Sequence, residues 1–333
     1  MAHADDEATE EEVGGPSNSS LADITAELRL LVLGEAWWGQ RPEVNAHWSA
    51  PHPTVRQLEL LTTTLESMPN VDENVAEQAA ALVTIVLHSM PTHAEAIACS
   101  KALVFLMEVT DASCKLIQAC CERLSMVAGS ETIRTAELEF YLILALKMAC
   151  NRSGSRQQMK VAAHKLPLVL TRFCDHQSEG MRERALAILI TLRDELCNSE
   201  EVHRTSNLSV ELPTQVPTGI TLPENYATTL ADIVIAAADE ATFLCAYALQ
   251  GLHLILCNHP ARWRVALQAK KPMLANSICA RAARLEEMLQ NDAEDKVQEG
   301  GIARCDFAIS FNSATEIMAA FDSCANNDSD AAQ

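Results

Sequence analysis

Aromatic side chains are scarce in this sequence of 333 residues: they make up 4% of it, whereas apolar residues as a whole make up 48%. The apolar mass is therefore carried by Ala, Leu, Ile, Val and Met, whose shapes allow close packing of helix on helix. An all-β fold would be enriched in aromatic and β-branched residues. The composition predicts an all-α protein with a continuous core and excludes global disorder.

The local motifs of catalysis and nucleotide binding are also missing. The sequence contains neither a Gly-x-Ser-x-Gly elbow nor a Cys-Gly-Ser-Cys-Trp type of segment. Gly14-Gly15 and Gly300-Gly301 lack both the preceding strand and the Lys-Ser/Thr that a phosphate-binding loop requires. We therefore expect a protein that is not an enzyme.

Positive charge is in short supply, with 25 Lys and Arg against 45 Asp and Glu and a formal net charge of −20. Such a field repels phosphate, which argues against unspecific binding to nucleic acid or to an anionic membrane. No apolar run is long enough to span a membrane, and the best candidate, 243–257, is interrupted by Gln250 and His253. We expect no membrane insertion.

The 12 cysteines are spread along the chain, mostly at apolar helical positions such as Cys99, Cys150 and Cys245. The acidic N-terminal residues are the reverse of the basic region that opens a secretory signal. These features predict reduced, buried thiols and an intracellular protein, cytoplasmic or nuclear.

A helical pattern returns at a roughly constant spacing. Its equivalent points lie 40, 43 and 63 residues apart, and the last step contains a polar, proline-bearing segment of about 25 residues whose removal restores a step near 40. The equivalent points are Ala102, Leu142, Ala185 and Ala248. A period in the low forties is typical of stacked helical hairpins.

These patterns predict three parts: a disordered acidic tail over 1–19, a single α-helical repeat domain over 20–323, and a polar tail over 324–333. Within the domain, a Trp-rich cap is expected at 34–52 and an inserted loop at 198–223. The expected helices are 20–33, 53–67, 72–89, 92–109, 112–128, 131–150, 156–174, 178–197, 224–239, 241–257, 260–290 and 303–321. Thr92, Asp111, Ser130 and Ser178 are the predicted N-caps.

The segment from Leu168 to Leu192 contains the end of one helix, a short turn, and a helix with an early Arg and an Ala-Leu-x-x-Leu pattern. It resembles the armadillo/HEAT-like helical-repeat superfamily. The resemblance implies a right-handed solenoid whose inner surface binds protein segments. The chain departs from the nuclear-import armadillo receptors, because it lacks their regular array of groove Trp and Asn. The alternative is a generic all-α bundle.

Acidic residues are absent from two stretches, 142–172 and 259–284, each of which carries six positive charges. In a solenoid, helices at matching positions line one surface, so these cations could form a ridge for an acidic or phosphorylated protein segment. The predicted partner-binding residues are Arg152, Arg156, Lys160, Arg262, Arg264, Lys270 and Lys271. One alternative is a solvated face that balances acidic neighbours; another is an acidic tail that folds over the ridge.

Two Cys-x-His pairs, Cys174/His176 and Cys257/His259, end predicted helices, but they lie about 80 residues apart and no Cys-x-x-Cys accompanies them. Histidine is also favoured at a helix C-terminus by the helix dipole. We therefore expect no metal and no cofactor. Two further alternatives are a subunit of a larger complex held through apolar ridges, and a thiol- or metal-dependent helical enzyme.

Overall fold

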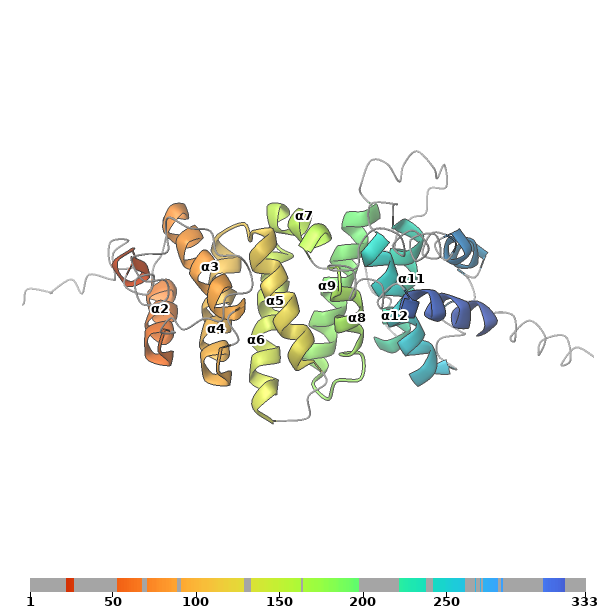
Figure 1. Ribbon diagram of the computed structural model, residues 1–333, viewed down its shortest axis with the longest axis horizontal. Helices are drawn as coiled ribbons and strands as arrows, with labels where there is room; N and C mark the ends of the chain where they lie inside the picture. The colour runs from red at the N-terminus through yellow and green to blue at the C-terminus, as the bar shows by residue number, and fades with distance from the viewer. Residues whose placement is uncertain are drawn as a thin grey trace, which may run out of the picture. The chain divides into compact units, whose positions relative to one another are not determined.

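The structure is a computed structural model that describes residues 22–26, 53–67, 71–88, 91–128, 133–162, 164–197, 222–237, 242–260, 267, 270, 272–280, 283 and 308–320. Helices joined by short turns make up these ranges, and no strand occurs among them (Figure 1). The all-α class predicted from the composition is confirmed. None of the helices in the described ranges combines the length and the apolar character needed to cross a membrane.

The chain divides into two compact units, Met1–Thr110 and Asp111–Gln333. The first contains α2 (Val55–Ser67), α3 (Glu73–His88) and α4 (His93–Val109). The second contains α5 (Cys114–Val127), α6 (Ile133–Ala149), α7 (Ser153–Ala162), α8 (Leu166–Thr171), α9 (Glu179–Cys197), α11 (Leu222–Ala236) and α12 (Thr242–Asn258). Residues 272–280 and 308–320 are also helical. A single repeat domain over 20–323 stays a prediction.

In the first unit α4 packs against both α2 and α3. Its start follows directly from the local sequence, because Thr92 and Glu95 form a capping box. The Glu95 N–H donates to Thr92 Oγ1 at 3.4 Å, and the Thr92 N–H donates to the Glu95 carboxylate at 2.7 Å. The predicted cap at Thr92 is confirmed.

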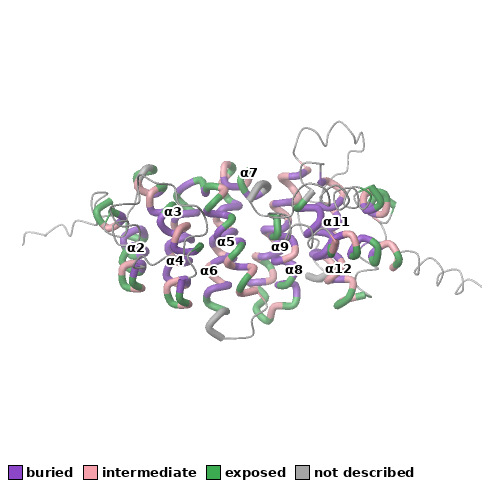
Figure 2. Tube along the Cα trace, viewed as in Figure 1, coloured by how far each residue is buried: buried purple, intermediate pink, exposed green. Residues whose placement is uncertain are grey.

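The helices of the second unit pack mainly on near neighbours in the chain. In this unit α5 contacts α6 and α7, α9 contacts α6, α7, α8 and α11, and α11 contacts α12 (Figure 1). Figure 2 shows buried residues repeating along the sides where these helices meet. One pairing of longer range, α8 with α12, brings the turn after α8 toward the C-terminal end of α12.

Gly251 is the residue that lets α12 approach α8 and α11 so closely. A Cβ atom at this position would lie 2.6 Å from Thr171 Oγ1 and 3.4 Å from a methyl group of Leu230. Thr171 is itself buried, and its hydroxyl donates to the Pro167 carbonyl at 2.6 Å. Because there is no room for a side chain here, glycine sets the distance between these helices.

Two details of the prediction were wrong. The single helix expected over 156–174 is two helices, α7 and α8, because Pro167 stands in the first turn of α8 and cannot donate to a preceding helical carbonyl. Asp111 does not cap α5; the Ser113 hydroxyl does, by accepting from the Leu116 N–H. The acidic tail 1–19, the Trp-rich cap 34–52 and the tail 324–333 lie outside the described residues. Of the loop expected over 198–223, residues 198–221 also lie outside them, and the last two residues belong to α11 instead.

Candidate functional site

Three of the seven predicted partner-binding residues have described side chains: Arg152, Arg156 and Lys270. Lys160 belongs to α7, but its side chain lies outside the described part of the chain, as do Arg262, Arg264 and Lys271. All three described cations lie in ion pairs with carboxylates of the same unit. Their role in binding a partner stays a prediction.

Arg152 pairs with a carboxylate from a distant part of the sequence. Its Nε atom lies 3.2 Å from Asp111 Oδ1, and the two side chains are 37% and 57% exposed. Asp111 also lies beside the start of α7, where a Cβ on Gly154 would come within 2.5 Å of its carboxylate. A negative charge at a helix N-terminus is stabilised by the helix dipole, so Asp111 favours this position even without Arg152.

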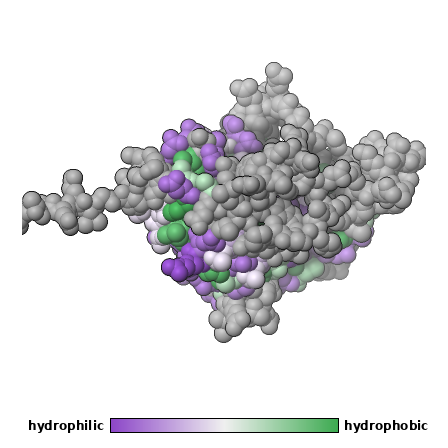
Figure 3. All heavy atoms as spheres, turned by 60° about the vertical axis from the view of Figure 1, so that its left-hand side comes forward, coloured by the Kyte–Doolittle hydropathy of each residue, from purple (hydrophilic) through white to green (hydrophobic). Residues whose placement is uncertain are grey.

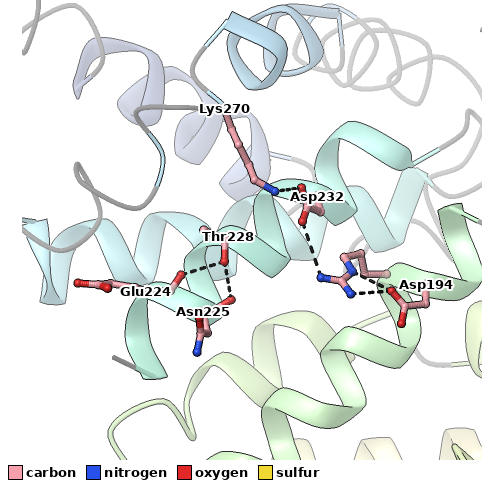
Figure 4. Close-up of polar contacts among 7 residues, drawn as sticks. Asp194, Glu224, Asn225, Thr228, Asp232 and Lys270 are labelled. Atoms are coloured by element: carbon pink, nitrogen blue, oxygen red, sulfur yellow. Dashed lines mark hydrogen bonds and ion pairs between the residues drawn. The ribbon is translucent and has the colours of Figure 1, made fainter. Parts of the chain in front are cut away.

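Further ion pairs join α7 to α9 and α9 to α11 in the second unit. Arg156 of α7 lies 3.4 Å from Glu195 of α9. Two residues before Glu195, Arg193 lies 2.7 Å from Asp194 and 3.9 Å from Asp232 of α11, and Asp232 also pairs with Lys270 (Figure 4). We call these residues the ion-pair chain: Arg156, Arg193, Asp194, Glu195, Asp232 and Lys270.

The ion-pair chain contains a cation from each acid-free stretch of the sequence, Arg156 from the first and Lys270 from the second. It contains three cations and three carboxylates, so its charges balance. Arg156 and Lys270 were predicted from the sequence, whereas Arg193 and the three carboxylates were not. Asp232 lies 38 residues before Lys270, and only the packing of the helices reveals such a pairing.

A second polar group lies where α8 and α12 end. Cys174 and Asp175 belong to the turn after α8, and His259 directly follows α12. His259 Nε2 lies 2.8 Å from Asp175 Oδ1 and 2.9 Å from Oδ2. Donor atoms of all three residues lie within 4.8 Å of one another. We call Cys174, Asp175 and His259 the donor cluster.

Cys174 is the buried member of the donor cluster, at 4% exposure. Burial raises the pKa of its thiol to about 12, and the charge of Asp175 and a hydrogen bond to it act in the same direction. Tyr226 is fully buried nearby, and its hydroxyl donates to the Arg182 carbonyl at 2.7 Å. Burial raises the pKa of this phenol, with a smaller contribution from Cys174. The Cys174 thiol is therefore buried and uncharged, whereas the Asp175 carboxylate is half-exposed to solvent.

The sequence singled out two Cys-x-His pairs, and the structure takes one residue from each into the donor cluster. His176 is not a member: its Nδ1 accepts from the Ser178 N–H at 3.0 Å and its Nε2 lies 3.9 Å from Glu139. Cys257 is not a member either, because its Sγ lies 3.4 Å from His253 Nε2. The spacing of these residues along the chain could not predict that Cys174 and His259 would come together while His176 and Cys257 would not.

No protein-family model, no curated protein and no solved structure matches this chain. The class of protein therefore rests on the structure, which is all-α in the part that it describes.

Proposed function

We propose that this chain is a non-enzymatic scaffold that binds protein segments on the surface of an armadillo/HEAT-like, right-handed helical solenoid. The observation that supports this most strongly is the packing order in the second unit, where α5, α6, α7, α9, α11 and α12 contact near neighbours in the chain. Repeat proteins have this quasi-linear pattern, and their stacked helices leave long surfaces for partners. The repeat spacing in the sequence agrees with it.

The charged surface favours an acidic or phosphorylated partner segment. Arg152 and Arg156 are more than one-third exposed, lie one helical turn apart, and carry guanidinium groups suited to bidentate pairing with carboxylate or phosphate. A partner would take the place of Asp111 and Glu195. Exchange at Arg152 costs little, because an exposed ion pair contributes about 0–1 kcal/mol.

Apolar recognition has less support on the described surface. Figure 3 shows hydrophobic and hydrophilic residues interspersed over the described part of one face. Large apolar side chains that are exposed come from separate elements of the two units: Leu60, Val109, Met126, Phe243, Met273 and Ile309. Single exposed apolar residues are ordinary on protein surfaces. Charge is therefore the better guide to the partner.

The test starts with the tagged full chain, nuclease-treated lysate and washes at low and moderate salt, followed by mass spectrometry of the bound proteins. Overlapping peptides of each captured protein then define the bound segment, and calorimetry gives its Kd. Arg152→Gln is expected to weaken binding about tenfold, which is the loss of about 1.4 kcal/mol of a charge-assisted contact. Asp111→Asn is expected to tighten binding, because the intramolecular competitor is gone.

Lys115→Gln is the matched control, since Lys115 is exposed on α5 and lies outside both acid-free stretches. Its affinity should equal that of the unmodified chain. A bound segment whose affinity ignores both salt and the Arg152 and Asp111 substitutions would overturn the charge-based recognition. A lysate from which no protein is retained would overturn the scaffold itself.

A further inference from the structure

We propose that Cys174, Asp175 and His259 bind one Zn²⁺ ion, which ties the turn after α8 to the C-terminal end of α12. Among the residues that the structure describes, this is the only group of three or more Cys, His, Asp or Glu donors that all lie within 4.8 Å of one another. The inference goes beyond the proposed scaffold function, and neither depends on the other.

The spacing of the donors fits a tetrahedral ion after small side-chain rotations. Ligands at 2.0–2.3 Å from Zn²⁺ lie about 3.3–3.8 Å apart. His259 and Asp175 are closer than this, at 2.8 Å, and need to separate by less than about 1 Å to admit the ion. All three residues stand just beyond helix ends, where side chains and backbone adapt more easily than inside a helix.

The donor types select the metal. A thiolate sulfur, an imidazole nitrogen and a carboxylate oxygen suit Zn²⁺, whereas Mg²⁺ and Ca²⁺ prefer oxygen ligands throughout. Asp175 is half-exposed, so solvent reaches the cluster from its side. Three protein ligands and a fourth position open to water or to a group from a partner complete the coordination.

The charges of the surroundings agree with a cation at this place. The Cys174 thiol gives up its proton when it coordinates a metal ion, and the bound ion then faces a thiolate beside the Asp175 carboxylate. In the ion-pair chain, each carboxylate has an Arg or Lys partner. At the donor cluster the partner of Asp175 is His259, itself a metal-binding side chain. A divalent ion would neutralise both negative charges and leave His259 as a neutral ligand.

The test uses the purified full chain, stripped of metal with a chelator and then dialysed against Zn²⁺ or Co²⁺. Elemental mass spectrometry gives the stoichiometry, and the near-ultraviolet charge-transfer band of Co²⁺ reports a thiolate ligand. We expect one ion per chain and a thiolate band. Cys174→Ser should abolish the band, and His259→Gln should weaken Zn²⁺ binding by more than the roughly 10–100-fold that loss of an outer-shell partner costs.

Cys257→Ser is the matched control, because Cys257 is exposed, follows His253 by one turn, and lies two residues before His259. It also tests the other His in this region, since His253 Nε2 lies 2.5 Å from Glu316 and 3.4 Å from Cys257 Sγ. The control should keep both the band and the stoichiometry. A band lost in Cys257→Ser but retained in Cys174→Ser would overturn the assignment.

Absence of stoichiometric Zn²⁺ or Co²⁺ at neutral pH would also overturn the proposal. Circular dichroism of each metal-free variant establishes that it folds. If the buried Cys174→Ser change prevents folding, Asp175→Asn and His259→Gln decide the matter, because their side chains are 51% and 21% exposed in the parent chain. Unchanged Zn²⁺ affinity in both of these variants would contradict the assigned ligands.

Discussion

The ion-pair chain and the donor cluster surround their nearest cysteines with different charges. Cys197 ends α9 beside the ion-pair chain, and Cys174 belongs to the donor cluster. Burial is the main cause that raises the pKa of both thiols. At Cys197 the effect of Asp232 is opposed by Arg193 and Lys270. At Cys174, Asp175 adds to burial, and only a backbone hydrogen bond opposes them.

The two regions therefore balance negative charge in different ways. The ion-pair chain neutralises its carboxylates with Arg and Lys of the same unit. The donor cluster places a carboxylate beside a buried thiol, with a histidine as the partner of that carboxylate. The first arrangement balances its charges within the fold, whereas the second contains the three donor side chains proposed above to bind Zn²⁺.

The largest expected effect is on thiol chemistry. In the metal-free chain at pH 8, we expect alkylation of Cys174 to be more than about a hundredfold slower than that of the exposed Cys257, because burial raises the pKa of the Cys174 thiol to about 12 and also shields its sulfur from the reagent. Mass spectrometry of timed iodoacetamide reactions measures both rates. The unfolded chain is the control, and in it the two rates should converge. Equal rates in the folded chain would contradict the environment described for Cys174.

The next effect concerns the contact that holds the donor cluster together. Gly251→Ala is expected to lower the free energy of unfolding by about 2 kcal/mol, because the new Cβ meets Thr171 Oγ1 at 2.6 Å. It should also weaken Zn²⁺ binding, because α12 can no longer approach the turn after α8. Chemical denaturation measures the stability change.

Gly180→Ala is the matched control for this substitution, since its Cβ would meet only Arg184 Nη1 at 3.5 Å, an ordinary contact. It is expected to be neutral or stabilising by up to about 1 kcal/mol. Adding Thr171→Ala to Gly251→Ala removes the clashing hydroxyl and should recover part of the lost stability. Equal effects of the two glycine substitutions would show that Gly251 does not control the helix distance.

A smaller effect is expected at the centre of the ion-pair chain. Arg193→Met should lower the free energy of unfolding by about 1 kcal/mol, because Arg193 is only 11% exposed and serves both Asp194 and Asp232. It should also raise the pKa of Cys197, since Arg193 no longer opposes Asp232, and so slow the alkylation of that thiol. Lys115→Met on the exposed face of α5 is the control. Faster alkylation of Cys197 would reverse the expected sign and contradict the charge balance.

Much of the helical layout could be predicted from the sequence, because its signals are local. The apolar period and the N-cap residue Thr92 predicted α4 to within a residue. Pro167 was an equally local signal for the break between α7 and α8, and it was overlooked. Ser113, which caps α5, has a hydroxyl side chain like that of Thr92 and stands two residues after Asp111, the cap that the sequence analysis predicted.

The polar regions could be predicted only in part, because they depend on which helices meet. The sequence predicted Arg156 and Lys270 of the ion-pair chain but not Arg193. Glu195 and Asp232 come close to these cations only through the packing of α9 with α7 and α11. The sequence also showed both Cys-x-His pairs, yet one residue of each is combined with Asp175 only because α8 contacts α12. Spacing along the chain carries no information on such a contact.

The smallest expected effect separates stability from recognition at the exposed end of α7. A double-mutant cycle of Arg152→Gln and Asp111→Asn should give a coupling free energy below about 0.5 kcal/mol, because both side chains are more than one-third exposed. Each single variant should therefore fold like the parent chain in chemical denaturation. Against an acidic partner segment, however, the same two substitutions are expected to change affinity in opposite directions.

A coupling well above 1 kcal/mol would mean that Arg152 and Asp111 form a structural clamp between the start of α5 and the start of α7. Arg152 would then be held too firmly to exchange Asp111 for a partner's carboxylate or phosphate. A weak coupling together with opposite effects on binding would instead support the proposal that an acidic ligand replaces Asp111 as the partner of Arg152. The donor cluster should respond to neither substitution, because its three residues lie in the turn after α8 and directly after α12 rather than at the starts of α5 and α7.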